Sequence, residues 1–82
     1  MKTAIIIPSY KVKNHIIGLL EKLIVHNYNI YVVDDKCPDG SGKYVEESFN
    51  NPLVKVLYNE KNLGVGGAVK RGYAEAIKDN CE

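Results

Sequence analysis

The sequence predicts an α/β fold in which helices cover both faces of a parallel β-sheet. Three short apolar runs rich in isoleucine and valine are typical of buried strands, and each is followed by a segment in which apolar residues recur at helical spacing. Strands that alternate with helices pair in parallel through right-handed crossovers. We therefore expect the order β-α-β-α-β-α in a three-layer α/β/α arrangement.

The length and composition favour one small domain. The chain has 82 residues, of which 45% are hydrophobic and 26% are charged, and its formal net charge is +1. This length fits a single domain over residues 1–82. The near-neutral charge gives no electrostatic reason to expect a nucleic acid partner. The apolar runs are too short for a signal peptide or a membrane span, so we expect a cytoplasmic location.

The cysteines and histidines do not suggest a metal site. Cys37 and Cys81 are far apart and lack a CxxC partner, which fits free thiols in a reducing cytosol. His15 and His26 lack the spacing of metal ligands, and we expect both at the surface or at its boundary. We therefore predict that residues 1–82 alone bind no metal.

The first half of the chain reads as strand, helix and strand. Lys2–Ile7 predicts a strand that is buried on both faces and closed by Pro8. Apolar residues at spacings of three and four then predict an amphipathic helix, with Asn14 as its N-cap and Asn27 just past its end. Ile30–Val33 is the second predicted strand.

The second half continues the alternation. Lys43–Phe49 is a candidate short helix, and Val54–Tyr58 alternates in the manner of a third strand. Asn59–Gly67 reads as a glycine-rich loop, and Ala68–Lys78 as the final helix. We expect the buried stripe of this helix to contain Val69, Tyr73, Ala76 and Ile77.

Unusual residues follow each predicted strand. Pro8-Ser9-Tyr10 follows the first, Asp34-Asp35 the second and Asn59–Gly67 the third. In open parallel sheets, ligands bind at the carboxyl ends of the strands, so this edge is the candidate site. The ring of Tyr10 can stack there on a nucleobase, or it packs on the first helix.

Asp34 and Asp35 are adjacent carboxylates at the end of a predicted buried strand. Neighbouring side chains of a strand point to opposite faces, so the two need not serve one ligand. Such a carboxylate can accept hydrogen bonds from a base or a ribose, and it can equally start an Asx-turn without a ligand. A metal site that includes Asp39 has less support, because nothing supplies further oxygen ligands.

Gly64, Gly66 and Gly67 precede the last predicted helix. Glycines there allow backbone N–H groups to approach an anion at the helix N-terminus, and Lys70 and Arg71 add positive charge. The spacing G-x-G-G does not match the dinucleotide fingerprint G-x-G-x-x-G, and no P-loop ending is present. The alternative is close packing of the helix on the sheet through small residues.

Three ordered motifs together resemble the family 2 glycosyltransferases, whose fold is called GT-A. They are Ile5-Ile6-Ile7-Pro8-Ser9-Tyr10, then Val32-Val33-Asp34-Asp35 with Pro38-Asp39-Gly40-Ser41, then Asn62-Leu63-Gly64-Val65-Gly66-Gly67-Ala68. The polyprenyl-phosphate (dolichol-phosphate) mannosyl- and glucosyltransferase branch looks most similar. The resemblance covers essentially the whole chain, and it implies a Rossmann-like half-domain with the strand order 3-2-1.

The resemblance implies a pocket for a nucleotide-sugar donor linked to UDP or GDP. In this pocket Asp35 accepts a hydrogen bond from the base, whereas Asp34 holds the following loop. The glycine turn shapes the floor under the nucleotide and the sugar. The implied nucleotide-binding residues are Pro8, Tyr10, Val33 and Asp35, with structural support from Asp34, Gly64, Gly66 and Gly67.

The resemblance also implies elements that the sequence does not contain. In the family, a later Asp-x-Asp motif holds Mg²⁺ or Mn²⁺ against the donor diphosphate, and a further carboxylate is the general base. Neither appears before Glu82. The expected function is transfer of a hexose to an acceptor such as a polyprenyl phosphate or a polysaccharide, at the inner membrane face in the full-length enzyme. The 82 residues would be its donor-binding part, truncated before the metal motif, with no catalytic residue and no activity alone.

The expected strand order leaves the first strand, Lys2–Ile7, as an open apolar edge. Such edges pair with other chains, so we expect self-association there. Two other functions remain as alternatives: a non-catalytic α/β interaction module, and a sugar nucleotidyltransferase. The second is disfavoured because Pro8-Ser9-Tyr10 stands where such enzymes carry a glycine-rich loop with a basic residue.

Overall fold

The structure, a computed structural model, describes residues 3–9, 13–36, 40–49, 51–62 and 64–79. Along these residues three strands alternate with three helices, which confirms the predicted α/β class and the order of elements. The elements are β1 Ala4–Ser9, α1 Lys13–Ile24, β2 Asn29–Asp34, α2 Ser41–Ser48, β3 Val54–Tyr58 and α3 Gly64–Lys78.

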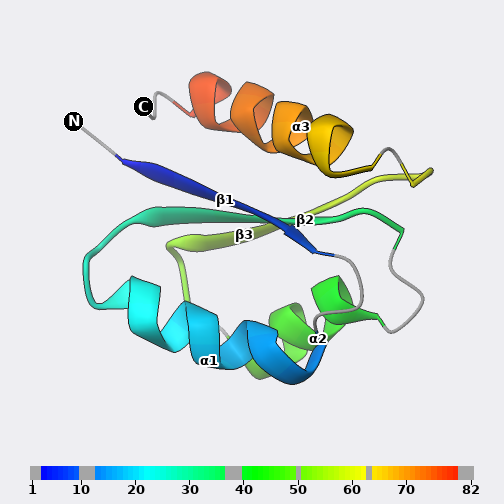
Figure 1. The fold of residues 1–82 in the computed structure, drawn as a ribbon. Coiled ribbons are helices and arrows are strands. Elements are labelled where there is room, and N and C mark those ends of the chain that lie inside the picture. The colour runs from blue at the N-terminus through cyan, green and yellow to red at the C-terminus, as the bar shows by residue number, and fades with distance from the viewer. Residues whose placement is uncertain (1–2, 10–12, 37–39, 50, 63, 80–82) are drawn as a thin grey trace.

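The three strands form one parallel sheet in the order β1-β2-β3, with β2 in the centre. Read from the opposite edge, this order is 3-2-1. Figure 1 shows three layers, in which α3 covers one face of the sheet and α1 and α2 cover the other. Because the strands are parallel, their carboxyl ends share one edge of the sheet, and α2 and α3 begin near that edge.

Pro8 lies inside β1 and does not close the strand as predicted. The carbonyl of Thr3 accepts from the N–H of Asn29 at 2.9 Å, and that of Ser9 accepts from the N–H of Asp35 at 3.2 Å. Successive residues of a strand direct their backbone groups to alternate sides, so Pro8 directs its own groups toward the open edge. Its missing N–H therefore costs no hydrogen bond within the sheet, which is why an edge strand tolerates it.

The predicted starts of all three helices were wrong. α2 begins at Ser41, two residues before the predicted Lys43. α1 begins at Lys13, so Asn14 lies in the first turn and is not the N-cap. α3 begins at Gly64 and not at Ala68, so the glycine-rich segment is the first turn of this helix. Asn27 lies just past α1 as predicted, with a φ of 57°, a left-handed conformation that asparagine tolerates.

The side chains of β2 alternate between two apolar cores, one on each face of the sheet. Ile30 and Val32 face α1 and α2, whereas Tyr31 and Val33 face α3, and all four are buried. The buried partners are Ile16, Leu20 and Val45 on the first face, and Leu57, Ala68 and Ala76 on the second.

The predicted buried stripe of α3 was largely wrong. Val69, Tyr73 and Ile77 are 39%, 60% and 55% exposed, and Ala76 is the one predicted member that is buried. The face that packs on the sheet carries small residues instead. Helical spacing alone did not reveal this, because a stripe of large apolar residues and a stripe of small ones recur with the same period.

Gly72 sets how closely α3 approaches the sheet. A Cβ atom at this position would lie 2.5 Å from Cγ2 of Ile6 and 3.1 Å from Cγ2 of Val33. Ala68 and Ala76, one turn to either side, are also buried. The role of close packing, which the sequence suggested for Gly66, Gly67 and Ala68, is therefore carried by Ala68, Gly72 and Ala76.

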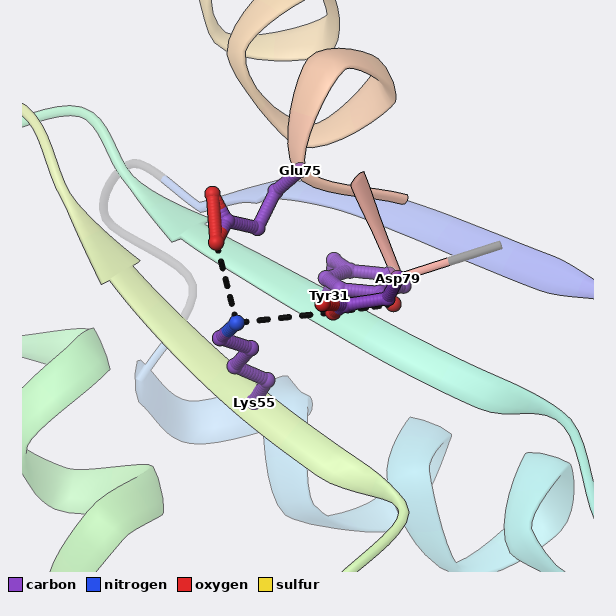
Figure 2. A network of polar contacts seen from close by, with 4 residues as sticks. All are labelled: Tyr31, Lys55, Glu75 and Asp79. Carbon is purple, nitrogen blue, oxygen red and sulfur yellow. Dashed lines mark hydrogen bonds and ion pairs between the residues drawn. The ribbon is translucent and has the colours of Figure 1, made fainter. Parts of the chain in front are cut away.

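A polar network on β2 and β3 holds the C-terminal end of α3, as Figure 2 shows. The hydroxyl of Tyr31 donates to Oδ2 of Asp79 at 2.9 Å. Nζ of Lys55 lies 3.0 Å from Glu75 and 3.4 Å from Asp79. The Tyr31 hydrogen bond, helped by Lys55, lowers the pKa of Asp79, and the hydrogen bond to Glu75 raises the pKa of Lys55.

Candidate functional site

Asp35 follows β2 at the carboxyl edge of the sheet and is 4% exposed. Its Oδ1 accepts from Nδ2 of Asn59 at 2.9 Å, and its Oδ2 accepts from the backbone N–H of Gly64 at 2.8 Å. Oδ1 of Asn62 lies 3.0 Å from the same N–H. Asp35 therefore places a negative charge at the N-terminus of α3, where the unpaired N–H groups and the helix dipole stabilise it.

Asp34 is also buried, but it belongs to the other side of the sheet. Its Oδ2 accepts from the backbone N–H of Gly42 at 2.9 Å, in the first turn of α2. A Cβ atom at Gly42 would lie 2.6 Å from that oxygen, so the contact requires glycine. The two adjacent carboxylates thus serve two different helix N-termini, and Asp34 supports the segment that begins α2.

On the β3 side, Asn59 contacts Asp35 and is itself held by Arg71. Nη1 of Arg71 donates to Oδ1 of Asn59 and to the carbonyl of Tyr58, each at 2.6 Å. The backbone N–H of Asn59 donates to the carbonyl of Asp34 at 2.9 Å. These bonds tie the end of β3 to the second turn of α3 and to the end of β2, directly beside Asp35.

A pocket of about 210 Å³ opens beside Asp35. It is smaller than the roughly 300–1,000 Å³ of complete small-molecule sites, so it can hold one part of a ligand. Within the described part of the chain, Oγ of Ser9 has no hydrogen-bond partner although the residue is fully buried. The pocket is lined by Pro8, Ser9, Asp35, Asn62, Gly64 and Val65.

The structure brings some of the predicted site residues together. Pro8, Asp35 and Gly64 line the same pocket. Val33 is fully buried in the core beneath α3, so its contact with a nucleotide stays a prediction. Tyr10 lies outside the described residues. The supporting glycines Gly66 and Gly67 follow Gly64 in the first turn of α3, and Asp34 lies on the opposite side of the sheet.

Gly64 needs to be glycine for a conformational reason. Its φ is +77°, in the left-handed region that residues with a Cβ rarely adopt. This conformation turns the chain into α3 and aims its N–H at Asp35. Sequence reasoning missed Asn59 and Asn62 as partners here, although asparagines after a strand are a known signal for side chains that hydrogen bond to local backbone.

A second hollow, of about 400 Å³, lies between β1 and α1. It is lined by Ile7, Pro8, His15, Ile16 and Leu19, which are mostly apolar. Across the described ranges, no three His, Cys, Asp or Glu residues gather where they could hold a metal ion. Nor is any helix in those ranges both long enough and apolar enough to cross a membrane.

Residues 4–79 match the family model described as Glycosyl transferase family 2. The chain belongs to this family. The match spans all six elements of the fold and the three segments that line the Asp35 pocket. The resemblance inferred from the motifs is thereby confirmed.

Named relatives agree with the polyprenyl-phosphate branch. The chain is 36% identical to a dolichol-phosphate mannosyltransferase of Pyrococcus furiosus, over 96% of this chain and 24% of the relative. It is 30% identical to an undecaprenyl-phosphate 4-deoxy-4-formamido-L-arabinose transferase of Proteus mirabilis, over 95% of this chain and 26% of the relative. An uncharacterized protein of Methanocaldococcus jannaschii is 32% identical, over 92% of this chain and 34% of the relative.

The chain therefore spans about a quarter to a third of the length of the curated relatives that it matches. No solved structure matches it significantly.

Proposed function

We propose that the chain binds the nucleoside end of a nucleotide-sugar donor, linked to UDP or GDP, in the pocket beside Asp35. Asp35 is the observation that carries the proposal. It is a buried carboxylate in the wall of a pocket, at the edge where parallel sheets bind ligands. A carboxylate has about four acceptor positions, so bonds from Asn59 and Gly64 are compatible with a further bond from the N–H of a base.

The proposed reaction of the complete enzyme is transfer of a hexose to a polyprenyl phosphate or a polysaccharide. Membership of the family supports transfer from a nucleotide-sugar donor. The names of two relatives, dolichol-phosphate mannosyltransferase and undecaprenyl-phosphate arabinose-type transferase, support a polyprenyl phosphate as the acceptor. Because such acceptors reside in membranes, we place the complete enzyme at the cytoplasmic face of a membrane.

A divalent cation does not fit the described residues. Asp34 and Asp35 bind different helix N-termini on opposite sides of the sheet, and no group of three ligands gathers in the described ranges. We propose that the Mg²⁺ or Mn²⁺ of the complete enzyme is held by residues outside these 82. Because both carboxylates of this edge are engaged in capping, we also propose that the 82 residues bind the donor without transferring the sugar.

A titration tests the donor site directly. The ¹⁵N-labelled chain is titrated with UDP and with GDP, each with and without Mn²⁺, and amide shifts are followed. We expect shifts at Ser9, Asp35, Gly64 and Val65 with one nucleotide, independent of Mn²⁺. Shifts that spread over the surface, or none at millimolar nucleotide, would favour a non-catalytic interaction module that keeps the fold.

We further propose that the chain self-associates with a second copy through the open edge of β1. Within the described residues β1 has a neighbour on one side only, and Ala4–Ser9 carries no charged side chain. An uncharged open edge readily pairs with another strand. Pro8 removes one edge donor, so pairing centres on the N-terminal part of β1.

The exposed side of α3 supports this interface. Val65, Val69, Tyr73 and Ile77 form an exposed apolar stripe at intervals of one turn. Tyr73 is two residues from both Arg71 and Glu75, which contact β3, so it lies about 160° around the helix from them. The stripe therefore faces away from β3, toward the open edge. A two-fold axis normal to the sheet would pair two β1 strands antiparallel and bring two such stripes together.

A further inference from the structure

Arg71 is an exposed residue of α3 that reaches across to the end of β3. Its Nη1 donates to the carbonyl of Tyr58 and to Oδ1 of Asn59, each at 2.6 Å. Hydrogen bonds from a charged donor are shorter and about twice as strong as neutral ones. The contact therefore fixes Asn59 more firmly than a neutral neighbour would.

Asn59 passes this constraint on to Asp35. The side chain is 7% exposed, and its Nδ2 donates to Oδ1 of Asp35 at 2.9 Å. A guanidinium has only donors and a carboxylate only acceptors, so the amide between them can adopt one orientation alone. The second oxygen of Asp35 is held by the N–H of Gly64 at 2.8 Å. Hydrogen bonds thus hold both oxygens of the Asp35 carboxylate and fix its orientation.

We propose that Arg71 and Asn59 are positioning residues, which orient the carboxylate of Asp35 for recognition of the nucleoside of the donor. The proposal rests on the proposed function. Arg71 is not among the residues that line the pocket, so it acts through Asn59 and not by touching the ligand. We call this chain of contacts, from Arg71 through Asn59 to Asp35, the relay. It makes nucleotide affinity depend on a residue that lies outside the pocket.

Charge-matched variants test the relay by NMR titration with UDP and GDP. Arg71→Met should weaken binding about tenfold, the effect of one lost charge-assisted hydrogen bond, while Lys78→Met at the far end of the same helix should change it less than about twofold. Arg71→Lys, which keeps a cationic donor but not the planar guanidinium, should restore part of the affinity. If Arg71 only stabilised the fold, the nucleotide affinity of each variant would change in parallel with its melting temperature. Arg71→Lys and Arg71→Met variants of equal stability would then bind nucleotide equally.

A double-mutant cycle shows whether Arg71 acts through Asn59. If the relay is real, Arg71→Met combined with Asn59→Ala weakens binding no more than Asn59→Ala alone, because the two act in series. Additive losses would overturn the relay. So would a folded Arg71→Met variant that binds nucleotide as tightly as the unaltered chain.

A measurement without nucleotide separates the failure of the relay from the failure of the donor site. Hydrogen exchange of the Asn59 side-chain amide is followed in the free chain. We expect exchange at least about tenfold faster in Arg71→Met than in Lys78→Met, because the amide loses the Arg71 donor that fixes its orientation. Equal exchange rates would overturn the relay. If exchange changes as expected and neither nucleotide binds the unaltered chain, the donor site fails while the Arg71–Asn59 contact stands.

Discussion

Asp34 and Asp35 carry like charges on neighbouring residues, and the structure directs each to a different helix. Two unit charges about 4 Å apart repel by about 1 kcal/mol in water and about 4 kcal/mol at an effective dielectric of 20. Each hydrogen bond to a charged group contributes about 1.5–3 kcal/mol, and three such bonds come from Gly42, Asn59 and Gly64. The capping bonds are therefore large enough to offset the repulsion between the two carboxylates.

Among single residues, we expect Gly72 to show the largest loss of stability when one carbon is added. Gly72→Ala should lower the free energy of unfolding by about 1–3 kcal/mol, because the new Cβ overlaps Ile6 and crowds Val33. Gly66→Ala is the matched control, since nothing lies within 4 Å of its Cβ position, and it should be neutral or stabilising by up to about 1 kcal/mol. Urea unfolding of both variants provides the measurement. Equal stability of the two would mean that α3 does not approach the sheet as closely as described.

Among the elements, α3 is held differently at its two ends. Its N-terminus is capped by Asp35, and its C-terminal end is held by the network of Tyr31, Lys55, Glu75 and Asp79 (Figure 2). Arg71 bonds the middle of the helix to the end of β3. The middle of the helix packs through Gly72. Because polar side chains fix both ends, the helix sits in one register on the sheet, which keeps the Gly64 N–H at Asp35.

The network at the C-terminal end predicts a pH effect. The pKa of Asp79 is lowered in the folded state, first by the Tyr31 hydroxyl, so its contribution to stability is present above the unfolded pKa and is lost as the pH falls through the folded pKa. Tyr31→Phe should therefore lower stability clearly at about pH 6 and much less at about pH 2. Thermal unfolding at both values measures this. Tyr73→Phe, at an exposed residue of the same helix, is the control and should show no such pH dependence.

How far the sequence predicts the elements depends on how local their causes are. Val54–Tyr58 was predicted with its observed bounds, because the alternation of apolar residues that indicates a strand depends only on the residues of that strand. The start of α3 was missed because glycine normally disfavours helices, and the cap that fixes it, Asp35, comes from another element. The roles of Asn59 and Arg71 depend likewise on contacts between separate elements, which no short motif specifies.

The buried face of α3 shows a second limit. Val69, Tyr73 and Ile77 have the size and period of core residues, yet they are exposed. Close approach to branched side chains on β1 and β2 favours small residues, and the sequence pattern does not contain the distance between helix and sheet. The sequence predicts the pocket only in part. The position of Asp35 at the sheet edge follows from the topology, but the orientation of its side chain does not.

For the whole molecule, the open edge of β1 and the apolar stripe of α3 predict a concentration-dependent dimer. Sedimentation velocity should show self-association of the unaltered chain, and Tyr73→Glu should shift it toward monomer by placing a charge in the stripe. Val25→Glu is the control, since Val25 is 72% exposed but follows α1 on the other face. A monomer at the highest soluble concentration, or equal loss with both variants, would contradict the interface.

The central claim is that Asp35 receives the nucleoside of the donor, and titration calorimetry with UDP and GDP tests it most directly. The chains to compare are the unaltered one, Asp35→Asn, and Asp79→Asn, which removes a carboxylate from the opposite end of α3. We predict that one nucleotide binds the unaltered chain, that Asp35→Asn weakens it about tenfold or more, and that Asp79→Asn changes it less than about twofold. Binding that is equal in Asp35→Asn and the unaltered chain, or no binding of either nucleotide at millimolar concentration, would contradict the claim.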